Sequence, residues 1–231
     1  MKKLYYLISL LLLASALVFT GCDDDDDPPA ENEEEIINFV RLTFTSDPEG
    51  QTSHVVSFEG LDVDADGPLD FETDTINLLQ DREYTLSIEV GSRLEGEEEE
   101  DVTPEIRREA TAHQFFFAWT GEIFAEPTGS GNFANDGESS GPFGVVNGQL
   151  NYADVETTYQ SEANPEDGIE PRNNVPVGLS TTWRTGNVSN NTQQFRVVLK
   201  HQPGIKMANT NSNTEGSGTD LNATFPINIV Q

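Results

Sequence analysis

The chain contains three histidines, His54, His113 and His201, and one of them lies four residues after a glutamate. Glu109 and His113 fall in a segment that we expect to be helical, and side chains four residues apart on a helix face the same way. Imidazole nitrogen and carboxylate oxygen are common ligands of transition metals. We therefore predict a transition-metal site formed by Glu109 and His113 and completed from a strand by His201 or His54. The alternative is that His113 makes only hydrogen bonds at the end of the helix.

A second candidate site is the sequence DVDADG at residues 62–67, in which Asp62, Asp64 and Asp66 alternate before a glycine. Alternate aspartates in a turn direct several oxygens at one hard cation, and the glycine allows the sharp bend that follows. A helix–loop–helix calcium site carries a bidentate glutamate at the twelfth position, which is Thr73 in this chain. The pattern therefore predicts either a calcium loop between two strands or an ordinary polar turn of an acidic protein.

Aromatic side chains offer a third kind of site. Trp119 and Trp183, together with Phe115–Phe117, could form a platform on which a sugar ring stacks, although their period-two spacing favours positions in the core. The acidic run at residues 95–101 is typical of a solvated loop. The sequence has no phosphate-loop or H-E-x-x-H motif. We therefore expect a binding protein rather than an enzyme.

The segments that must position these residues alternate apolar and polar side chains, which predicts half-buried strands. The predicted inward rows are Val40–Leu42–Phe44, Val56–Phe58, Tyr84–Leu86–Ile88–Val90, Leu179–Trp183, Phe195–Val197–Leu199 and Leu221–Ala223–Phe225–Ile227–Ile229. Arg196 and Lys200 are predicted to point outward, and Pro226 indicates an edge position. Many short strands with polar connections predict an all-β fold, an antiparallel β-sandwich of the Ig-like kind with one short helix.

The predicted helix lies in the sequence DVTPEIRREATAH. Thr103 is the expected N-cap, and Pro104 occupies the first helical position, where its missing N–H costs nothing. The aromatic run that follows, Phe115–Trp119, is interpreted as a buried strand. Two long polar stretches, residues 127–142 and 159–174, are expected to be surface loops.

The first residues are typical of an export signal. Lys2 and Lys3 precede the uncharged apolar stretch Leu4–Phe19, and small residues then lead to Cys22, the only cysteine. The apolar stretch is shorter than the roughly 20 residues that a membrane-spanning helix needs. We expect residues 1–21 to be a signal peptide, 22–35 an acidic flexible tether, and 36–231 the folded β-sandwich domain. An uncleaved anchor helix is the alternative for the first segment.

The charge balance restricts the partners. The chain carries a formal net charge of −29, and the acids continue beyond the tether into the body of the protein. Nucleic acids and anionic lipid headgroups are therefore poor partners, whereas cations and basic protein surfaces are suitable ones.

The stretch FTGC at residues 19–22 resembles the lipobox of bacterial lipoproteins, which implies that Cys22 becomes the lipidated N-terminus and anchors the protein to the membrane. Several further stretches, including FEGLDVDADG, EIRREATAHQFFF and GTDLNATFPINIV, resemble a family of Bacteroidota surface lipoproteins often labelled as type 1 periplasmic binding folds. That label requires alternating strands and helices, which this sequence lacks. The resemblance implies an outer-membrane protein exposed on the cell surface, acting beside a TonB-dependent uptake receptor. Three functions remain open. The first is ligand capture, with a metal ion as the favoured cargo; the alternatives are a structural or adhesive module stabilised by calcium, and a glycan-binding module.

Overall fold

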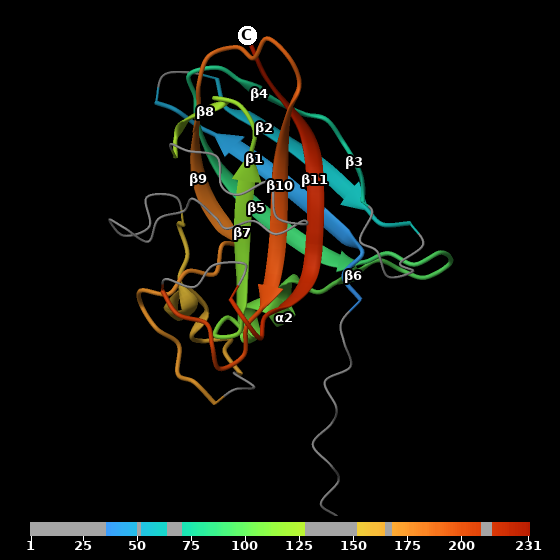
Figure 1. Cartoon of the computed structure of the whole chain (residues 1–231), viewed down its shortest axis with the longest axis vertical. Coiled ribbons are helices and arrows are strands. Elements are labelled where there is room, and N and C mark those ends of the chain that lie inside the picture. The colour runs from blue at the N-terminus through green and yellow to red at the C-terminus, as the bar shows by residue number, and fades with distance from the viewer. Residues whose placement is uncertain (1–35, 50–51, 64–70, 128–151, 165–167, 209–213) are drawn as a thin grey trace, which may run out of the picture. The chain divides into compact units, whose positions relative to one another are not determined.

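The structure, a computed structural model, describes residues 36–49, 52–63, 71–127, 152–164, 168–208 and 214–231. Two β-sheets face each other, and Figure 1 shows β7, β10 and β11 in front of β1, β2 and β5. The larger sheet has the strand order β3 (Glu72–Thr73), β2 (His54–Leu61), β1 (Phe39–Ser46), β5 (Glu83–Ser92), β9 (Ser180–Thr185) and β8 (Phe124–Glu126), with β6 (Glu100–Asp101) paired to β5. The smaller sheet has the order β4 (Ile76–Leu79), β11 (Gly218–Val230), β10 (Gln193–His201) and β7 (His113–Trp119). This architecture confirms the predicted all-β sandwich.

One strand pair departs from the antiparallel expectation, because β4 pairs with the end of β11 in parallel. The parallel ladder begins at Ile227, immediately after Pro226. Over the part of β11 that includes Pro226, one side of the strand has no ladder partner, so the proline removes no sheet hydrogen bond there. The predicted edge character of Pro226 therefore holds locally.

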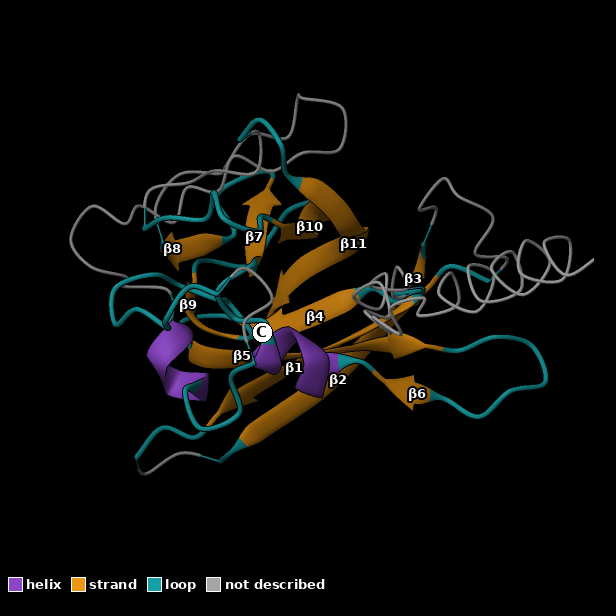
Figure 2. Ribbon diagram, turned by 90° about the horizontal axis from the view of Figure 1, so that it is seen from below, coloured by secondary structure: helices purple, strands orange, loops and turns teal. Residues whose placement is uncertain are grey.

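The predicted inward rows form the core between the sheets. All the apolar residues predicted on β1, β5, β10 and β11 are buried, and Figure 2, seen from the end that carries α2, shows the two layers that enclose them. Trp119 and Trp183 meet edge to face with ring centroids 5.3 Å apart. Each indole is about 1% exposed. They are core residues, so neither offers a platform to a sugar.

Lys200 does not point into solvent as predicted, since its side chain is 1% exposed. The middle of β10 is buried on both faces, because Val198 and Lys200 are covered as well as the inward row. Thr219 Oγ1 accepts a hydrogen bond from the buried Lys200 ammonium at 2.5 Å, which supplies part of the polar contact that a buried charge needs.

The helix α2 (Thr103–Arg108) is shorter than the sequence pattern suggested, and its N-cap is Val102 rather than Thr103. The Thr103 side chain instead bonds to the backbone of Val90, accepting from its N–H at 2.9 Å and facing its carbonyl oxygen at 3.2 Å. Thr103 thus ties the start of α2 to β5. The helix stops at Arg108 because the aromatic run that follows pairs with β10 as β7, which is buried along its whole length.

The outer edge of β7 is closed by segments from later in the chain. The Phe115 N–H donates to Val177 O at 2.7 Å, and the Tyr152 hydroxyl donates to Phe115 O at 2.7 Å. Asp154 accepts from the Gly178 N–H at 2.9 Å and so fixes the covering segment. The short 3-10 helix η2 (Glu156–Tyr159) follows. These bonds supply partners for the backbone N–H and carbonyl groups of Phe115 at the edge of the sheet, and they fix the beginning of β7.

Candidate metal centre

Glu109 is placed by the turn that joins α2 to β7. It is the C-terminal cap of α2, and its carbonyl oxygen accepts from the N–H groups of Ala112 at 2.8 Å and His113 at 3.1 Å. The expectation that one helix carries both Glu109 and His113 was wrong, because His113 is the first residue of β7. The bond from His113 N–H to Glu109 O still has helical spacing. For that reason the two side chains meet although the helix has ended.

His113 and His201 are cross-strand partners in the β7–β10 ladder. The pair extends a row of core pairs, since Phe115 lies opposite Leu199 on the same face. The imidazole rings stack with centroids 4.6 Å apart and an interplanar angle of 9°. The strand alternation therefore brings to one point two histidines that lie almost ninety positions apart in the sequence.

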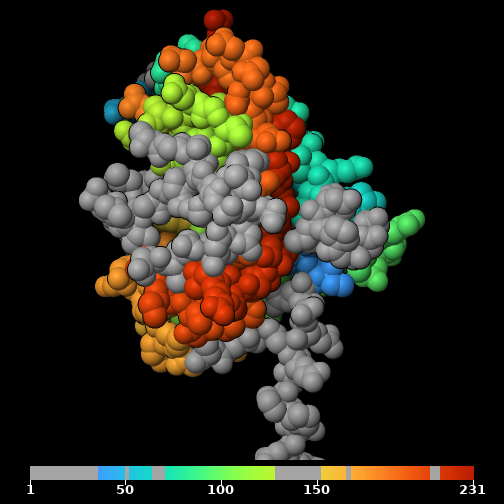
Figure 3. All heavy atoms as spheres, viewed as in Figure 1, coloured from blue at the N-terminus to red at the C-terminus, as the bar shows by residue number. Residues whose placement is uncertain are grey.

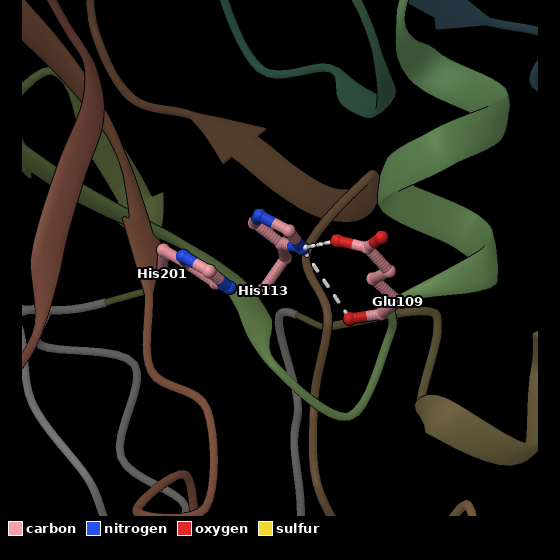
Figure 4. Close-up of side chains that lie close together, drawn as sticks. All are labelled: Glu109, His113 and His201. Carbon is pink, nitrogen blue, oxygen red and sulfur yellow. Dashed lines mark hydrogen bonds and ion pairs between the residues drawn. The ribbon is translucent and has the colours of Figure 1, made fainter. Parts of the chain in front are cut away.

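Glu109, His113 and His201 converge at the end of the sandwich core, as Figure 4 shows. One ligand atom from each side chain lies within 4.8 Å of the other two. His113 Nδ1 lies 3.6 Å from the Glu109 carboxylate and 3.4 Å from the Glu109 carbonyl oxygen. These separations exceed a good hydrogen bond of 2.7–3.2 Å. The 3.6 Å between His113 Nδ1 and the Glu109 carboxylate is close to the ligand–ligand distance of about 3.3 Å that follows from tetrahedral geometry and metal–nitrogen bonds near 2 Å.

The environment keeps His113 neutral. Its side chain is buried, and burial, then the neighbouring His201, and also Lys206 lower the His113 pKa to about 3, while the Glu109 carbonyl opposes the shift. Two carboxylates are nearby, Glu109 at 3.6 Å and Asp220 at 3.5 Å. Both distances are too long for hydrogen bonds, so burial dominates. A neutral imidazole is the form that coordinates a metal ion.

His201 supplies a ring nitrogen that the fold does not satisfy. Its Nε2 atom is buried and has no hydrogen-bond partner among the described residues. The residue as a whole is only partly buried, in contrast to Glu109 and His113. The cluster is therefore more exposed at His201 than at Glu109 or His113.

The segment after β10 holds the Glu109–His113 turn in place. Gln202 N–H donates to Ala112 O at 2.7 Å, and the Lys206 ammonium donates to Ala110 O at 2.5 Å. In Figure 1 this orange-red segment lies at the same end of the sandwich as α2, and Figure 3 shows it at the surface of this face. Because it follows His201 directly, these bonds fix His201 and the turn relative to each other.

Lys206 is completely buried and lies 3.4 Å from Glu156, which is also inaccessible. Burial lowers the Lys206 pKa to about 8, and Glu156 opposes the shift. Arg172 adds a bidentate contact to Glu156, with distances of 2.6 and 2.8 Å. Sequence reasoning missed this ion cluster, because no short motif relates Glu156, Arg172 and Lys206.

The other predicted site residues do not join this centre. His54 lies on β2, where its Nδ1 is 2.9 Å from the Tyr84 hydroxyl. Asp62 is buried after the end of β2, with its backbone N–H bonded to Asn38 O at 2.8 Å.

Asp64, Asp66 and Cys22 lie outside the described residues, so the calcium loop and lipidation stay predictions. Most of the loop predicted at residues 127–142 is also outside this range, and residues 159–174, where described, begin at the end of η2 and continue as turns and irregular chain.

Comparisons with protein-family models, with curated proteins and with solved structures found no match. Within the described residues, no helix has the length and apolar character needed to cross a membrane.

Proposed function

We propose that this protein is a lipid-anchored protein of the outer cell surface that captures a transition-metal ion without catalysing a reaction. The observation that carries the proposal is the convergence of Glu109, His113 and His201, whose ligand atoms lie within 4.8 Å of one another. The sequence pattern predicted Glu109 and His113 as ligands with either His201 or His54 as the third, and in the structure it is His201 that lies beside them. By the resemblance described above, the captured ion is passed to a TonB-dependent receptor.

The ligand set favours a particular class of ion. Two imidazole nitrogens and one carboxylate oxygen suit Zn²⁺, Cu²⁺, Ni²⁺ or Fe²⁺, whereas calcium prefers sites built from oxygen alone. Three protein ligands leave one position of a tetrahedral ion open. An open position suits a protein that must release its ion to a partner, because an incoming ligand can enter there.

The stacked rings must turn when an ion binds. The lone pair of an imidazole lies in the plane of its ring, and the two ring planes are nearly parallel, so the lone pairs do not meet at one point. Rotation of His201, the more accessible of the two rings, brings its nitrogen toward Glu109 and His113. We expect binding to be accompanied by loss of the stacked arrangement.

The cellular location rests on the N-terminal sequence. The signal-like residues 1–21, the single Cys22 and the acids that follow it support export, lipidation and display at the surface. Two or more acyl chains are sufficient for stable anchoring without a spanning helix. The overall charge of −29 supports attraction of cations and of a basic receptor surface.

The test is a titration of the detergent-solubilised full-length chain with Zn²⁺, Cu²⁺, Co²⁺ and Ca²⁺ by calorimetry. We expect at least one transition metal to bind far more tightly than 1 mM, and Co²⁺ to give the visible absorption of a low-symmetry site. Glu109→Gln and His201→Gln should abolish this binding, whereas the matched controls Glu105→Gln and His54→Gln should retain it. If no transition metal binds more tightly than about 1 mM, equivalent to about 4 kcal/mol, the metal function is wrong.

A second candidate function is a structural or adhesive module stabilised by calcium. The observation in its favour is Asp62, a carboxylate residue only 1% exposed at the start of the predicted calcium loop. This alternative predicts a large loss of thermal stability when a calcium chelator is added, together with no transition-metal binding. Asp62→Asn should then produce the same loss without chelator.

A further inference from the structure

Asp220 occupies an irregular position in β11, next to the two histidines. In the β10–β11 ladder, Leu199 pairs with Leu221 but Lys200 pairs with Thr219. Asp220 is therefore the extra residue of a β-bulge. Bulges commonly redirect a side chain next to a functional site. Here the bulge coincides with a carboxylate whose Oδ2 lies 3.5 Å from His113 Nε2, two strands away.

Two carboxylates therefore flank the His113 ring on opposite edges. Glu109 faces Nδ1 at 3.6 Å, and Asp220 faces Nε2 at 3.5 Å. One ion bound through His113 can have only one of these carboxylates as a ligand. Glu109 shares a compact ligand set with both histidines, which places the ion on the Nδ1 side.

We propose that Asp220 is a positioning residue of the metal site, which accepts the Nε2 proton of His113 and leaves the Nδ1 lone pair directed at the ion. The proposal rests on the metal-binding function proposed above. Carboxylates commonly hold the second nitrogen of a metal-bound histidine in this way, fixing both the tautomer and the ring orientation.

The Glu109 carbonyl oxygen competes with Asp220 for the proton of His113. In the competing arrangement the proton is on Nδ1, which donates to this carbonyl in a long hydrogen bond of 3.4 Å. That carbonyl already accepts the N–H groups of Ala112 and His113. A carbonyl oxygen has two lone pairs, so this one is poorly placed to accept a third hydrogen bond. The carboxylate of Asp220 is the stronger acceptor for the proton of His113.

The experiment measures the His113 tautomer directly, with long-range ¹H–¹⁵N NMR on the metal-free full-length chain in detergent near pH 7.5. We expect the Nε2–H tautomer in the wild type and in Asp220→Asn, which keeps an acceptor oxygen. Asp220→Leu should shift His113 toward the Nδ1–H tautomer. Asn222→Leu, on the same strand, is the matched control and should leave the tautomer unchanged.

Zinc titration of the same proteins gives the second readout. Asp220→Leu should weaken zinc binding by about 10–100-fold, the usual effect of losing such a partner, and Asp220→Asn should weaken it less. Zinc should shift the Nδ1 resonance of His113. An Nδ1–H tautomer in the wild type, or zinc bound through Nε2, overturns the role of Asp220 while the metal function stands. Absence of binding of zinc and of the other transition metals tested above, with an Nε2–H tautomer, overturns the metal function itself, and with it Asp220's role in the site.

Discussion

The burial of His113 makes the metal-free protein sensitive to mild acid. The His113 pKa falls from 6.5 to about 3 on folding, chiefly because burial disfavours the charged ring. Between these two values the unfolded chain binds more protons than the folded one. The free energy of unfolding therefore decreases as the pH falls from 6.5 toward 3, and this part of the stability is fully present only above pH 6.5.

The magnitude follows from the difference between the two pKa values. Each pH unit between them contributes 1.36 kcal/mol, so at pH 5, about 1.5 units below the unfolded value, the loss is about 2 kcal/mol. Below pH 3 it reaches about 5 kcal/mol. A loss of this size is a substantial part of the stability of an ordinary domain.

Urea unfolding of the chelator-treated protein at pH 7, 6 and 5 measures this loss, provided that the transition is two-state. His113→Gln is the comparison, because it removes the ionisable ring and keeps a polar side chain. His54, whose pKa is also lowered by burial and by Arg82, titrates in both proteins and cancels in the difference.

We expect the wild type to lose about 2 kcal/mol more than His113→Gln between pH 7 and pH 5. The opposite sign is also informative. If Glu109 and Asp220 held a charged imidazolium in the folded state, the wild type would gain stability relative to the variant as the pH falls. That result, or equal pH dependence of the two proteins, would refute the reasoning from burial.

Three further predictions concern other parts of the chain. Lys206→Met should reduce the free energy of unfolding by about 3 kcal/mol, measured in urea at pH 7, because it removes one partner of a buried ion pair; unchanged stability would show that packing compensates fully. Gly178→Ala should cost about 2–4 kcal/mol in the same assay, since φ is +93° and the added Cβ would lie 2.9 Å from Phe115 Cβ and Tyr152 Cε1; a smaller loss means that the segment shifts to admit the methyl group. Cys22→Ser should move the protein from the detergent phase to the aqueous phase and abolish palmitate labelling, and retention in the membrane fraction would contradict lipid anchoring.

Period-two patterns were sufficient to predict the sheet residues, because each face of a strand meets a different environment. The row Tyr84, Leu86, Ile88 and Val90 is buried as predicted, and so is the row that ends at Ile229. The pattern failed at Lys200, where both faces of β10 are covered. It also failed to reveal the parallel pairing of β4 with β11, since alternation gives the face of a side chain but not the direction of a neighbouring strand.

The meeting of Glu109 and His113, two of the candidate metal ligands, was predictable for a reason that was only partly right. The spacing of four residues correctly predicted that the side chains of Glu109 and His113 meet. A turn brings them together, however, rather than a continuing helix. Alternation could not choose between His201 and His54, because His54 shares its parity with the predicted inward residues Val56 and Phe58; the pairing of β7 with β10 decides it. His113 has the same parity as the core residues Phe115 and Phe117, and His201 has the same parity as Leu199. Asp220 and Lys206 were out of reach, because a bulge and a buried ion cluster depend on tertiary contacts that leave no local pattern.

The position of the centre is itself an argument for function. The Phe115–Leu199 pair is an ordinary apolar core pair, and the next pair along the same face is His113–His201. Two apolar side chains there would bury more hydrophobic surface and avoid desolvating imidazole and carboxylate groups, each of which costs free energy without a full set of partners. Instead, four elements place polar groups together: the end of α2, the paired ends of β7 and β10, and the bulge of β11. Core positions are normally apolar, and here several elements place polar side chains at one point of the core. A bound ligand that offsets the desolvation of these groups is the simplest physical reason for this arrangement.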